Sequence, residues 1–281
     1  MKLLRSGPAG AEIPAILDPD GVIRDLSQHI GDIGAETVTP AGLERIAALP
    51  LDRLPVVDPA TRIGACIARP ANFVCIGLNY SDHAAEAGLD APKEPVVFLK
   101  STGSICGAHD AIEIPRGAEK TDWEVELGVV IGTRAKYVTR EAALDHVAGY
   151  CVVNDISERA FQTERGGTWD KGKGCDTFGP IGPWLVTRDE IPDPQNLRLW
   201  CDVDGHRMQD GNTRQMIFDV ATIISYVSAF ITLHPGDIIA TGTPAGVGLG
   251  QKPHPMFLKA GQRMRLGIDG LGVQEQALVA A

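Results

Sequence analysis

The stretch Thr121–Val130, TDWEVELGVV, decides how the rest of this sequence is interpreted. In a β-strand the side chains alternate, so Glu124 and Glu126 would point to one face and the apolar residues that alternate with them to the other. The two carboxylates would then stand about 7 Å apart along the strand. Like charges this close need a cation, a proton or open solvent, so the pair marks either a solvated strand face or a metal site. Taken alone, the pattern favours the solvated face.

The composition is that of an ordinary globular protein of 281 residues. Hydrophobic residues make up 44% of the chain and charged residues 22%, which gives no indication of disorder. Acidic residues outnumber basic ones, 36 against 26, and no Lys/Arg cluster occurs, so we expect neither a nucleic-acid nor an anionic-membrane partner. No apolar run has the length of a signal peptide or of a membrane span of about 20 residues, so we expect a cytoplasmic protein. Six scattered cysteines without CxxC spacing predict reduced thiols.

The pattern of apolar runs predicts an α+β, β-rich fold in two parts. Residues 1–70 are expected to form a small N-terminal domain and linker, with a hairpin around Asp18-Pro19-Asp20-Gly21 and a helix over Ala41–Ala48 capped by Thr39. Residues 71–281 are expected to form the larger domain, with one clear amphipathic helix over Asp219–Ile231. Short apolar runs bounded by Gly and Pro predict its strands: Phe73–Gly77, Pro95–Lys100, Trp123–Ile131, Tyr150–Asn154, Pro183–Thr187, Leu197–Val203, Ile238–Thr241, Met264–Ile268 and Val273–Val279.

A third carboxylate, Asp155, ends another apolar strand with the sequence CVVND. A lone Asp at a strand end is most often a turn or cap residue. Together with Glu124 and Glu126 it would instead complete three oxygen ligands, a set that suits Mg²⁺ or Mn²⁺. Zinc is disfavoured, because no His or Cys lies at ligand spacing nearby. The sequence leaves open whether the two strands are neighbours.

The segment GLNYSDHAAE, residues 77–86, carries a candidate general base. If Ser81 caps a short helix closed by Gly88, His83 and Glu86 share one helix face. A carboxylate beside an imidazole fixes its tautomer and raises its basicity, which suits a base that activates water. The simpler interpretation is a His–Glu pair on the surface. A short helix next to glycine is also a candidate lid.

Polar residues follow Asp155 in Gly-rich surroundings, namely Arg159, Gln162, Lys171 and Lys173. Such lysines are usually solvated loop charges, and an anion-binding role is the alternative. The segment TGTPAGVG, residues 241–248, lacks both GxGxxG and a GK[ST] ending, so nucleotide binding is only weakly indicated. No GxSxG or HExxH motif occurs, so a hydrolase built on this chain would use a metal and water rather than a serine.

Six motifs in this order resemble the fumarylacetoacetate hydrolase superfamily from about Ala71 to the C-terminus: GLNYSDHAAE, EPVVFLK, DWEVELGVVIG, YCVVNDISERAFQ, GKGCDTFGPIGPW and PGDIIATGTPAGVG. The resemblance implies a mixed β-roll core in a homodimer, with a small N-terminal β-containing domain. It implies a Mg²⁺ or Mn²⁺ ion held by Glu124, Glu126 and Asp155. By the same resemblance His83 and Glu86 form a water-activating dyad on a lid, and Lys173 lies beside the substrate enolate. Substrate contacts are implied for Arg159, Gln162 and Thr243.

The same resemblance implies hydrolysis of the C3–C4 bond of a 2,4-dioxo acid, an acylpyruvate. Within the superfamily the chain is similar to hydrolases of 2,4-diketo-3-deoxy-L-rhamnonate or -L-fuconate, which would release pyruvate and lactate. The alternatives are decarboxylation or tautomerisation of oxaloacetate-like or hydroxymuconate-like acids, and ureidoglycolate lyase activity. Reactions without an attacking water would not need the dyad of His83 and Glu86, so its presence favours hydrolysis. A non-catalytic binding protein of this fold is expected to lack a ligand carboxylate or the lysine, and all are present.

Overall fold

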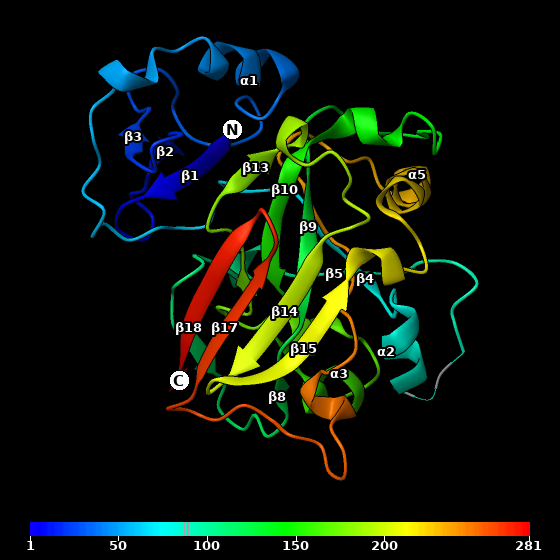
Figure 1. The fold of residues 1–281 in the computed structure, drawn as a ribbon. Helices are drawn as coiled ribbons and strands as arrows, with labels where there is room; N and C mark the ends of the chain where they lie inside the picture. Colours follow the sequence, from blue (N-terminus) through cyan, green and yellow to red (C-terminus); the bar gives the residue numbers. More distant parts are fainter. Residues whose placement is uncertain (87, 89) are drawn as a thin grey trace.

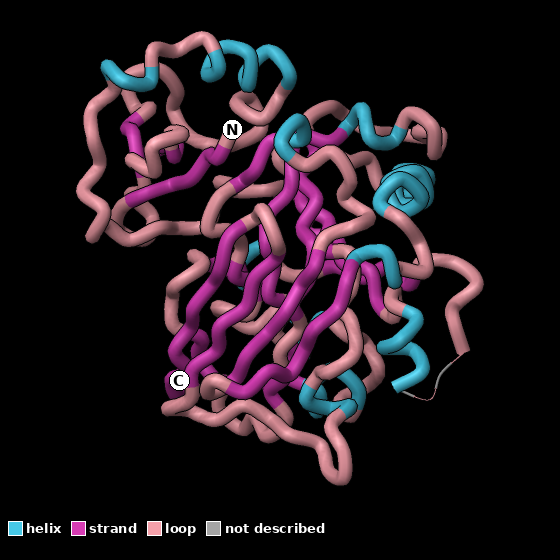
Figure 2. The backbone as a smooth tube through the Cα atoms, viewed as in Figure 1, coloured by secondary structure: helices cyan, strands magenta, loops and turns pink. Residues whose placement is uncertain are grey.

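Strands outnumber helices in the computed structural model, which describes residues 1–86, 88 and 90–281 (Figures 1 and 2). One large sheet contains β1 (Lys2–Ser6), β2 (Ile13–Leu17), β3 (Ile23–Asp25), β4 (Phe73–Gly77), β5 (Val96–Leu99), β9 (Val125–Ile131), β10 (Val147–Asn154), β13 (Leu185–Thr187) and β16 (Ile238–Ala240). A second sheet contains β7 (Ile112–Ile114), β14 (Arg198–Val203), β15 (His206–Asn212), β17 (Arg263–Ile268) and β18 (Gly272–Ala280). Short pairings join β6 (Ile105–Cys106) to β12 (Gly179–Pro180) and β8 (Thr121–Asp122) to β11 (Ser157–Glu158).

The helices are short and lie around the sheets (Figure 2). The α-helices are α1 (Pro40–Ala47), α2 (Ser81–Glu86), α3 (Arg159–Thr163), α4 (Asp170–Lys173) and α5 (Val220–Phe230). Single 3₁₀ turns cover Leu51–Arg53, Thr102–Ser104, Ala143–His146, Arg188–Glu190, Thr213–Gln215 and Gly248–Gly250. None of the helices in the described residues combines the length and the apolar character of a membrane-spanning segment.

The strand order of the large sheet is β3-β2-β1-β13-β10-β9-β16-β4-β5. Strands β16 and β4 run parallel, and the other neighbours are antiparallel. The second sheet has the order β15-β14-β17-β18-β7 and lies across one face of the first (Figure 1). The β-rich, mixed α+β fold predicted from the apolar runs is therefore confirmed.

Local sequence signals account for most element boundaries. All nine strands predicted beyond residue 71 are present, with ends that shift by a few residues. The predicted hairpin is formed by β2 and β3. Helix α1 begins at Pro40, and Thr39 caps it by accepting a hydrogen bond from the Gly42 amide over 3.1 Å. Helix α5 is capped in the same way by Asp219.

The stretch Thr121–Val130 is not one continuous strand. Strand β9 begins at Val125, whereas Thr121 and Asp122 pair with β11 and Trp123 and Glu124 lie between the two strands. The alternation beyond that break is as predicted. The odd-numbered apolar residues of β9 enter the core between the two sheets.

Two hydrophobic clusters bury both faces of the central strands. One lies between the two sheets and draws on β9, β10, β14 and β17. The other lies between the opposite face of the large sheet and the N-terminal segment, where it includes Leu3, Ile16, Val130 and Val153. Burial on both faces fixes β9 and β10 rigidly, and with them the side chains at their ends.

The N-terminal segment is an extension of the large sheet. Strand β1 pairs with β13, and the residues expected to form a linker include the buried Cys66 and Ile67. The domain boundary near residue 70 stays a prediction. All six cysteines are free, as expected from their spacing.

Candidate active site

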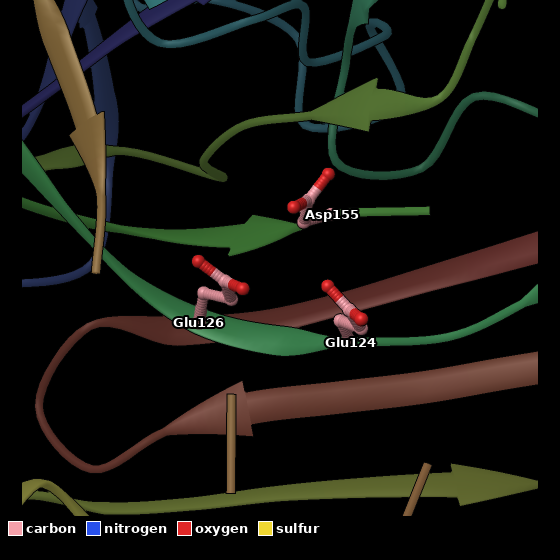
Figure 3. Close-up of side chains that lie close together, drawn as sticks. All are labelled: Glu124, Glu126 and Asp155. Atoms are coloured by element: carbon pink, nitrogen blue, oxygen red, sulfur yellow. The ribbon is translucent and has the colours of Figure 1, made fainter. Parts of the chain in front are cut away.

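Three carboxylates meet where β9 and β10 lie side by side (Figure 3). Glu126 is opposite Val153 in the strand register, and the amide of Asp155 donates to the carbonyl of Glu124 over 2.9 Å. One ligand oxygen from each of Glu124, Glu126 and Asp155 lies within 4.8 Å of the others. Glu124 is 5% exposed and Glu126 only 2%. The solvated strand face, which the local pattern favoured, is therefore wrong, because tertiary packing covers it.

Three cations surround these carboxylates. Lys173, at the end of α4, donates from Nζ to Glu124 Oε2 over 2.6 Å and to Asp155 Oδ2 over 2.7 Å. Arg159, at the start of α3, donates from Nη2 to Glu124 Oε1 over 2.6 Å. Lys100, which follows β5, places Nζ 2.5 Å from Asp155 Oδ1. Glu124 and Asp155 are therefore each held by two cations.

Glu126 differs from its neighbours because no salt bridge reaches it among the described residues. Its Oε2 accepts a hydrogen bond from the Gly242 amide over 2.8 Å. Burial raises the pKa of Glu126 well above its ordinary value, and the carboxylates of Asp155 and Glu124 raise it further. Burial also acts to raise the pKa of Glu124, but Lys173 and Arg159 outweigh it and hold that pKa at about 2. The site therefore contains a buried carboxylate that lacks its own countercharge.

The donor set fits a hard divalent cation. All three candidate ligands are carboxylate oxygens, which Mg²⁺ and Mn²⁺ prefer. Lys100, which contacts Asp155 Oδ1, also donates to the Ile156 carbonyl over 2.9 Å, so its ammonium group is held in place. A divalent ion would supply the countercharge that Glu126 lacks. Glu124, Glu126 and Asp155 are the residues that would hold it.

The His83–Glu86 pair lies on α2, as the spacing predicted. His83 Nδ1 is 3.3 Å from Glu86 Oε2, and Glu86 also accepts a hydrogen bond from the Gly246 amide over 3.0 Å. Their side chains are 13% and 18% exposed, so the pair is not an ordinary surface pair. Since Nδ1 faces Glu86, Nε2 is the nitrogen available to a molecule beside His83. The helix begins at Ser81 itself, one residue earlier than a capping role would require.

A cavity of about 210 Å³ joins these groups. Its wall includes eight of the nine site residues predicted from the sequence; Glu86 lies behind His83. Lys171 is exposed, donates to the Arg165 carbonyl and is not part of the wall, so the sequence-based anion role is not supported for it. The predicted residues on the wall are His83, Glu124, Glu126, Asp155, Arg159, Gln162, Lys173 and Thr243.

Three buried polar residues that support the site were missed in the sequence. Asp122 accepts from Arg159 Nε over 2.9 Å and from the amides of Gly248 and Leu249. Gln209 donates to Thr243 Oγ1 over 2.8 Å and accepts from the Val125 amide over 3.0 Å. Lys100 is the third. Asp122, Glu124 and Glu126 are alternate residues of one stretch, so the alternation of side chains could have identified Asp122 as a site residue. Gln209, on β15, has no such pattern around it in the sequence.

Comparisons with known proteins agree with this geometry. The sequence profile of the fumarylacetoacetate (FAA) hydrolase C-terminal family matches residues 72–279. A Burkholderia ambifaria protein, provisionally named a hydrolase, is 65% identical over 277 residues, which cover 99% of this chain and 98% of the relative. The solved fumarylacetoacetate hydrolase of Exiguobacterium antarcticum is 36% identical, with a TM-score of 0.88 and full coverage of both chains.

Two further similar structures are of enzymes that are named for their reactions. Each comparison covers all of this chain and all of the other chain. Maleylpyruvate hydrolase of Sphingobium sp. SYK-6, in complex with manganese(II) and pyruvate, is 27% identical with a TM-score of 0.82. The 5-carboxymethyl-2-hydroxymuconate delta-isomerase of Mycobacterium smegmatis is 28% identical with a TM-score of 0.78. On the profile match and the 65% identity, this chain belongs to the fumarylacetoacetate hydrolase family.

Proposed function

We propose that this protein hydrolyses the C3–C4 bond of a 2,4-dioxo acid and releases pyruvate and a carboxylic acid. One observation carries the proposal: a single cavity is lined by a carboxylate triad, a buried lysine and a histidine, His83, whose Nδ1 faces Glu86. The triad and the lysine suit a substrate that becomes an enolate, and the His–Glu pair suits activation of water.

The cofactor in this proposal is Mg²⁺ or Mn²⁺ held by Glu124, Glu126 and Asp155. When bound, a divalent ion would orient the 1-carboxylate and 2-oxo oxygens of the substrate and offset the negative charge of the departing enolate. The manganese(II) and pyruvate in the solved maleylpyruvate hydrolase support this choice of ion and of product.

The protein residues have separate roles in the proposed reaction. Glu86 accepts from Nδ1 of His83, which leaves the Nε2 lone pair to take a proton from water. The resulting hydroxide attacks the C4 carbonyl, and the C3–C4 bond then breaks to give the acid and the enolate of pyruvate. Lys173 places its ammonium group beside the triad, where it stabilises the negative charge on the enolate. Protonation of C3 completes pyruvate.

Substrate contacts are proposed for Arg159, Gln162 and Thr243, which line the same cavity. Arg159 Nη1 donates to Gln162 Oε1 over 3.1 Å, so these two side chains act as one unit. Thr243 Oγ1 already donates to the Val125 carbonyl and accepts from Gln209, which fixes its orientation. The substrates we favour are 2,4-diketo-3-deoxy-L-rhamnonate and -L-fuconate, which would yield pyruvate and lactate.

The decisive test is a screen of 2,4-dioxo acids with Mg²⁺ and with Mn²⁺, in which pyruvate release is measured. We expect release from at least one acid in the presence of either ion and none in excess chelator. Failure of every acid to release pyruvate, with both ions present, would contradict the proposal.

The second candidate is isomerisation or decarboxylation at the same triad, and the similarity to the solved delta-isomerase favours it. Such reactions have no attacking water, so they would not need His83. Oxaloacetate decarboxylation and hydroxymuconate isomerisation should be measured for the wild type and for His83→Ala. Activity that survives the substitution at the wild-type rate, with no pyruvate released from acylpyruvates, would favour the second candidate.

We also propose that the protein works as a cytoplasmic homodimer, without nucleic-acid or membrane partners. The assembly is checked by light scattering behind a sizing column, where a monomer at micromolar concentration would contradict it.

A further inference from the structure

One wall of the active-site cavity is apolar. It is formed by residues of β4 and β5, the residue after β4, the residue before α4 and the 3₁₀ turn Gly248–Gly250, namely Ile76, Leu78, Phe98, Trp169 and Leu249. The carboxylate triad lines the same cavity and forms its charged end together with Lys173, while the five apolar residues form its apolar side. Nothing in the proposed reaction uses the apolar side, which leaves it for the acyl half of the substrate.

Two aromatic residues lie next to each other beside Lys173. Lys173 Nζ lies 5.2 Å from the centroid of the Phe98 ring, and that ring meets Trp169 edge-on with 5.2 Å between centroids. Trp169 in turn rests on the backbone of Gly77. A substrate whose carboxylate end lies at the triad beside Lys173 would therefore extend its acyl group along Phe98 toward Trp169.

This wall is rigid before any substrate arrives. A Cβ atom on Gly77 would lie 2.6 Å from the Trp169 ring, so the ring fills the space that a side chain would take. Leu78 has φ +53°, a conformation that is strained for leucine. The next residue, Asn79, is held by side-chain hydrogen bonds to the carbonyls of Phe218 and Thr241. A strained residue held by its neighbours indicates a preformed surface.

The cations of the cavity are already paired. Lys173 contacts Glu124 and Asp155, and Arg159 contacts Asp122 and Glu124. Among the described residues of the cavity wall, these two are the lysine and arginine side chains present. A second carboxylate at the far end of the acyl group would thus lie against aromatic rings, away from the two cations held at the triad, which is unfavourable.

We infer that the acyl group of the substrate is uncharged and ends in an apolar group, such as a methyl, alkyl or aryl group, packed on Phe98 and Trp169. This inference rests on the proposed acylpyruvate hydrolysis. It separates this protein from a maleylpyruvate hydrolase, because a maleyl group carries its own carboxylate. The proposed 6-deoxy sugar acids meet the requirement, since their C6 is a methyl group.

The test compares 2,4-dioxoheptanoate with 2,4-dioxoheptanedioate, two acylpyruvates that differ only in a terminal methyl or carboxylate. For the wild type with Mn²⁺ we expect kcat/KM to be at least about a hundredfold higher for the neutral acid. Equal or better turnover of the dioate overturns the inference while leaving the proposed hydrolysis intact. If neither acid releases pyruvate, the screen of other 2,4-dioxo acids decides the proposed hydrolysis. The inference is then decided by calorimetry, where a dissociation constant for the dioate equal to or below that for the neutral acid overturns it.

Substitutions of Trp169 test whether this residue determines the preference for the neutral acid. Trp169→Lys supplies a free cation and should lower the ratio of kcat/KM for the neutral acid to kcat/KM for the dioate at least about tenfold. Trp169→Leu keeps an apolar wall and should leave that ratio unchanged. An unchanged preference in a folded Trp169→Lys variant contradicts the assignment to this residue.

Binding of 2,4-dioxoheptanoate should change the tryptophan fluorescence of the wild type. In Trp169→Phe most of that fluorescence change should be lost. Trp200→Phe is the matched control, because Trp200 lies between Arg207 and Arg265 on the second sheet and should leave the change intact.

Discussion

Asp122 and Arg159 form a buried ion pair directly behind the carboxylate triad. Arg159 Nε donates to Asp122 Oδ2 over 2.9 Å, while Nη2 of the same guanidinium reaches Glu124 Oε1 over 2.6 Å. Asp122 is fully buried, and it also accepts the amides of Gly248 and Leu249. One carboxylate therefore fixes both the arginine and the loop that follows Thr243.

Asp122→Asn should destabilise the protein, because it leaves the buried guanidinium of Arg159 with half of its countercharge. The expected loss in the free energy of unfolding is about 3 kcal/mol, measured by urea unfolding. The control is Asp145→Asn, which breaks an exposed pair with Arg188 and should cost less than about 1 kcal/mol. Equal losses in the two variants would contradict the role given to Asp122.

Glu126→Gln should stabilise the metal-free protein and abolish its response to Mn²⁺. The substitution removes a buried, uncompensated carboxylate but keeps an acceptor for the Gly242 amide. In the wild type, Mn²⁺ at a hundred times its dissociation constant should add about 2.7 kcal/mol of stability. Thermal unfolding with and without Mn²⁺ measures both effects. A variant that is stabilised by Mn²⁺ as strongly as the wild type would show that Glu126 is not a ligand.

His83→Ala should lower kcat for acylpyruvate hydrolysis at least about a hundredfold, since it removes the proposed general base. Glu86→Gln should have a smaller effect, because the imidazole remains and only its orientation and basicity change. Pyruvate release is the measurement. His254→Ala, at an exposed position, is the control and should leave kcat unchanged. Normal hydrolysis by His83→Ala would remove His83 from the mechanism.

Asp110 should make stability depend on pH through its bidentate pair with Arg62, at 2.6 Å for both contacts. Burial acts to raise the pKa of Asp110, but the hydrogen bonds from Arg62 and from the Gly107 amide, together with the charge of Arg62, outweigh it and lower the pKa below its ordinary value. A carboxylate whose pKa is lowered by folding contributes stability above its unfolded pKa of about 3.9 and loses it as the pH falls through the folded pKa.

The measurement is urea unfolding of the wild type and of Asp110→Asn from pH 6 downward. The wild type should lose more stability than the variant as the pH falls below about 4. If the free energies of unfolding of the wild type and of Asp110→Asn differ by the same amount at every pH, the ionisation of Asp110 does not contribute to the pH dependence of stability. Because Arg62 lies in the N-terminal segment and Asp110 beyond residue 71, the result also measures how firmly the two parts are joined.

Local residue preferences explain why so much of the fold could be predicted. Thr39 and Asp219 cap helices by accepting hydrogen bonds from amides three residues away, and the turn after β2 depends on its own Asp and Gly. Strand β15 could not be found in this way, because its sequence HRMQDGN has no apolar alternation. It forms because β14 offers hydrogen bonds to it along its length. The same reason explains why Gln209, which β15 carries, was missed.

The candidate site, like the fold, could be predicted only in part from the sequence. The sequence by itself determined which residue types follow the strands, and its ordered motifs identified Glu124, Glu126, Asp155, His83 and Lys173 as candidates. Tertiary structure alone decided that the glutamates are buried rather than solvated, because the answer depends on sheet packing and on residues far away in the chain. It also decided that Asp122 and Lys100 hold the charges in place and that Phe98 and Trp169 face the cavity. Burial and long-range ion pairing are properties of contacts between distant segments, and no local pattern encodes them.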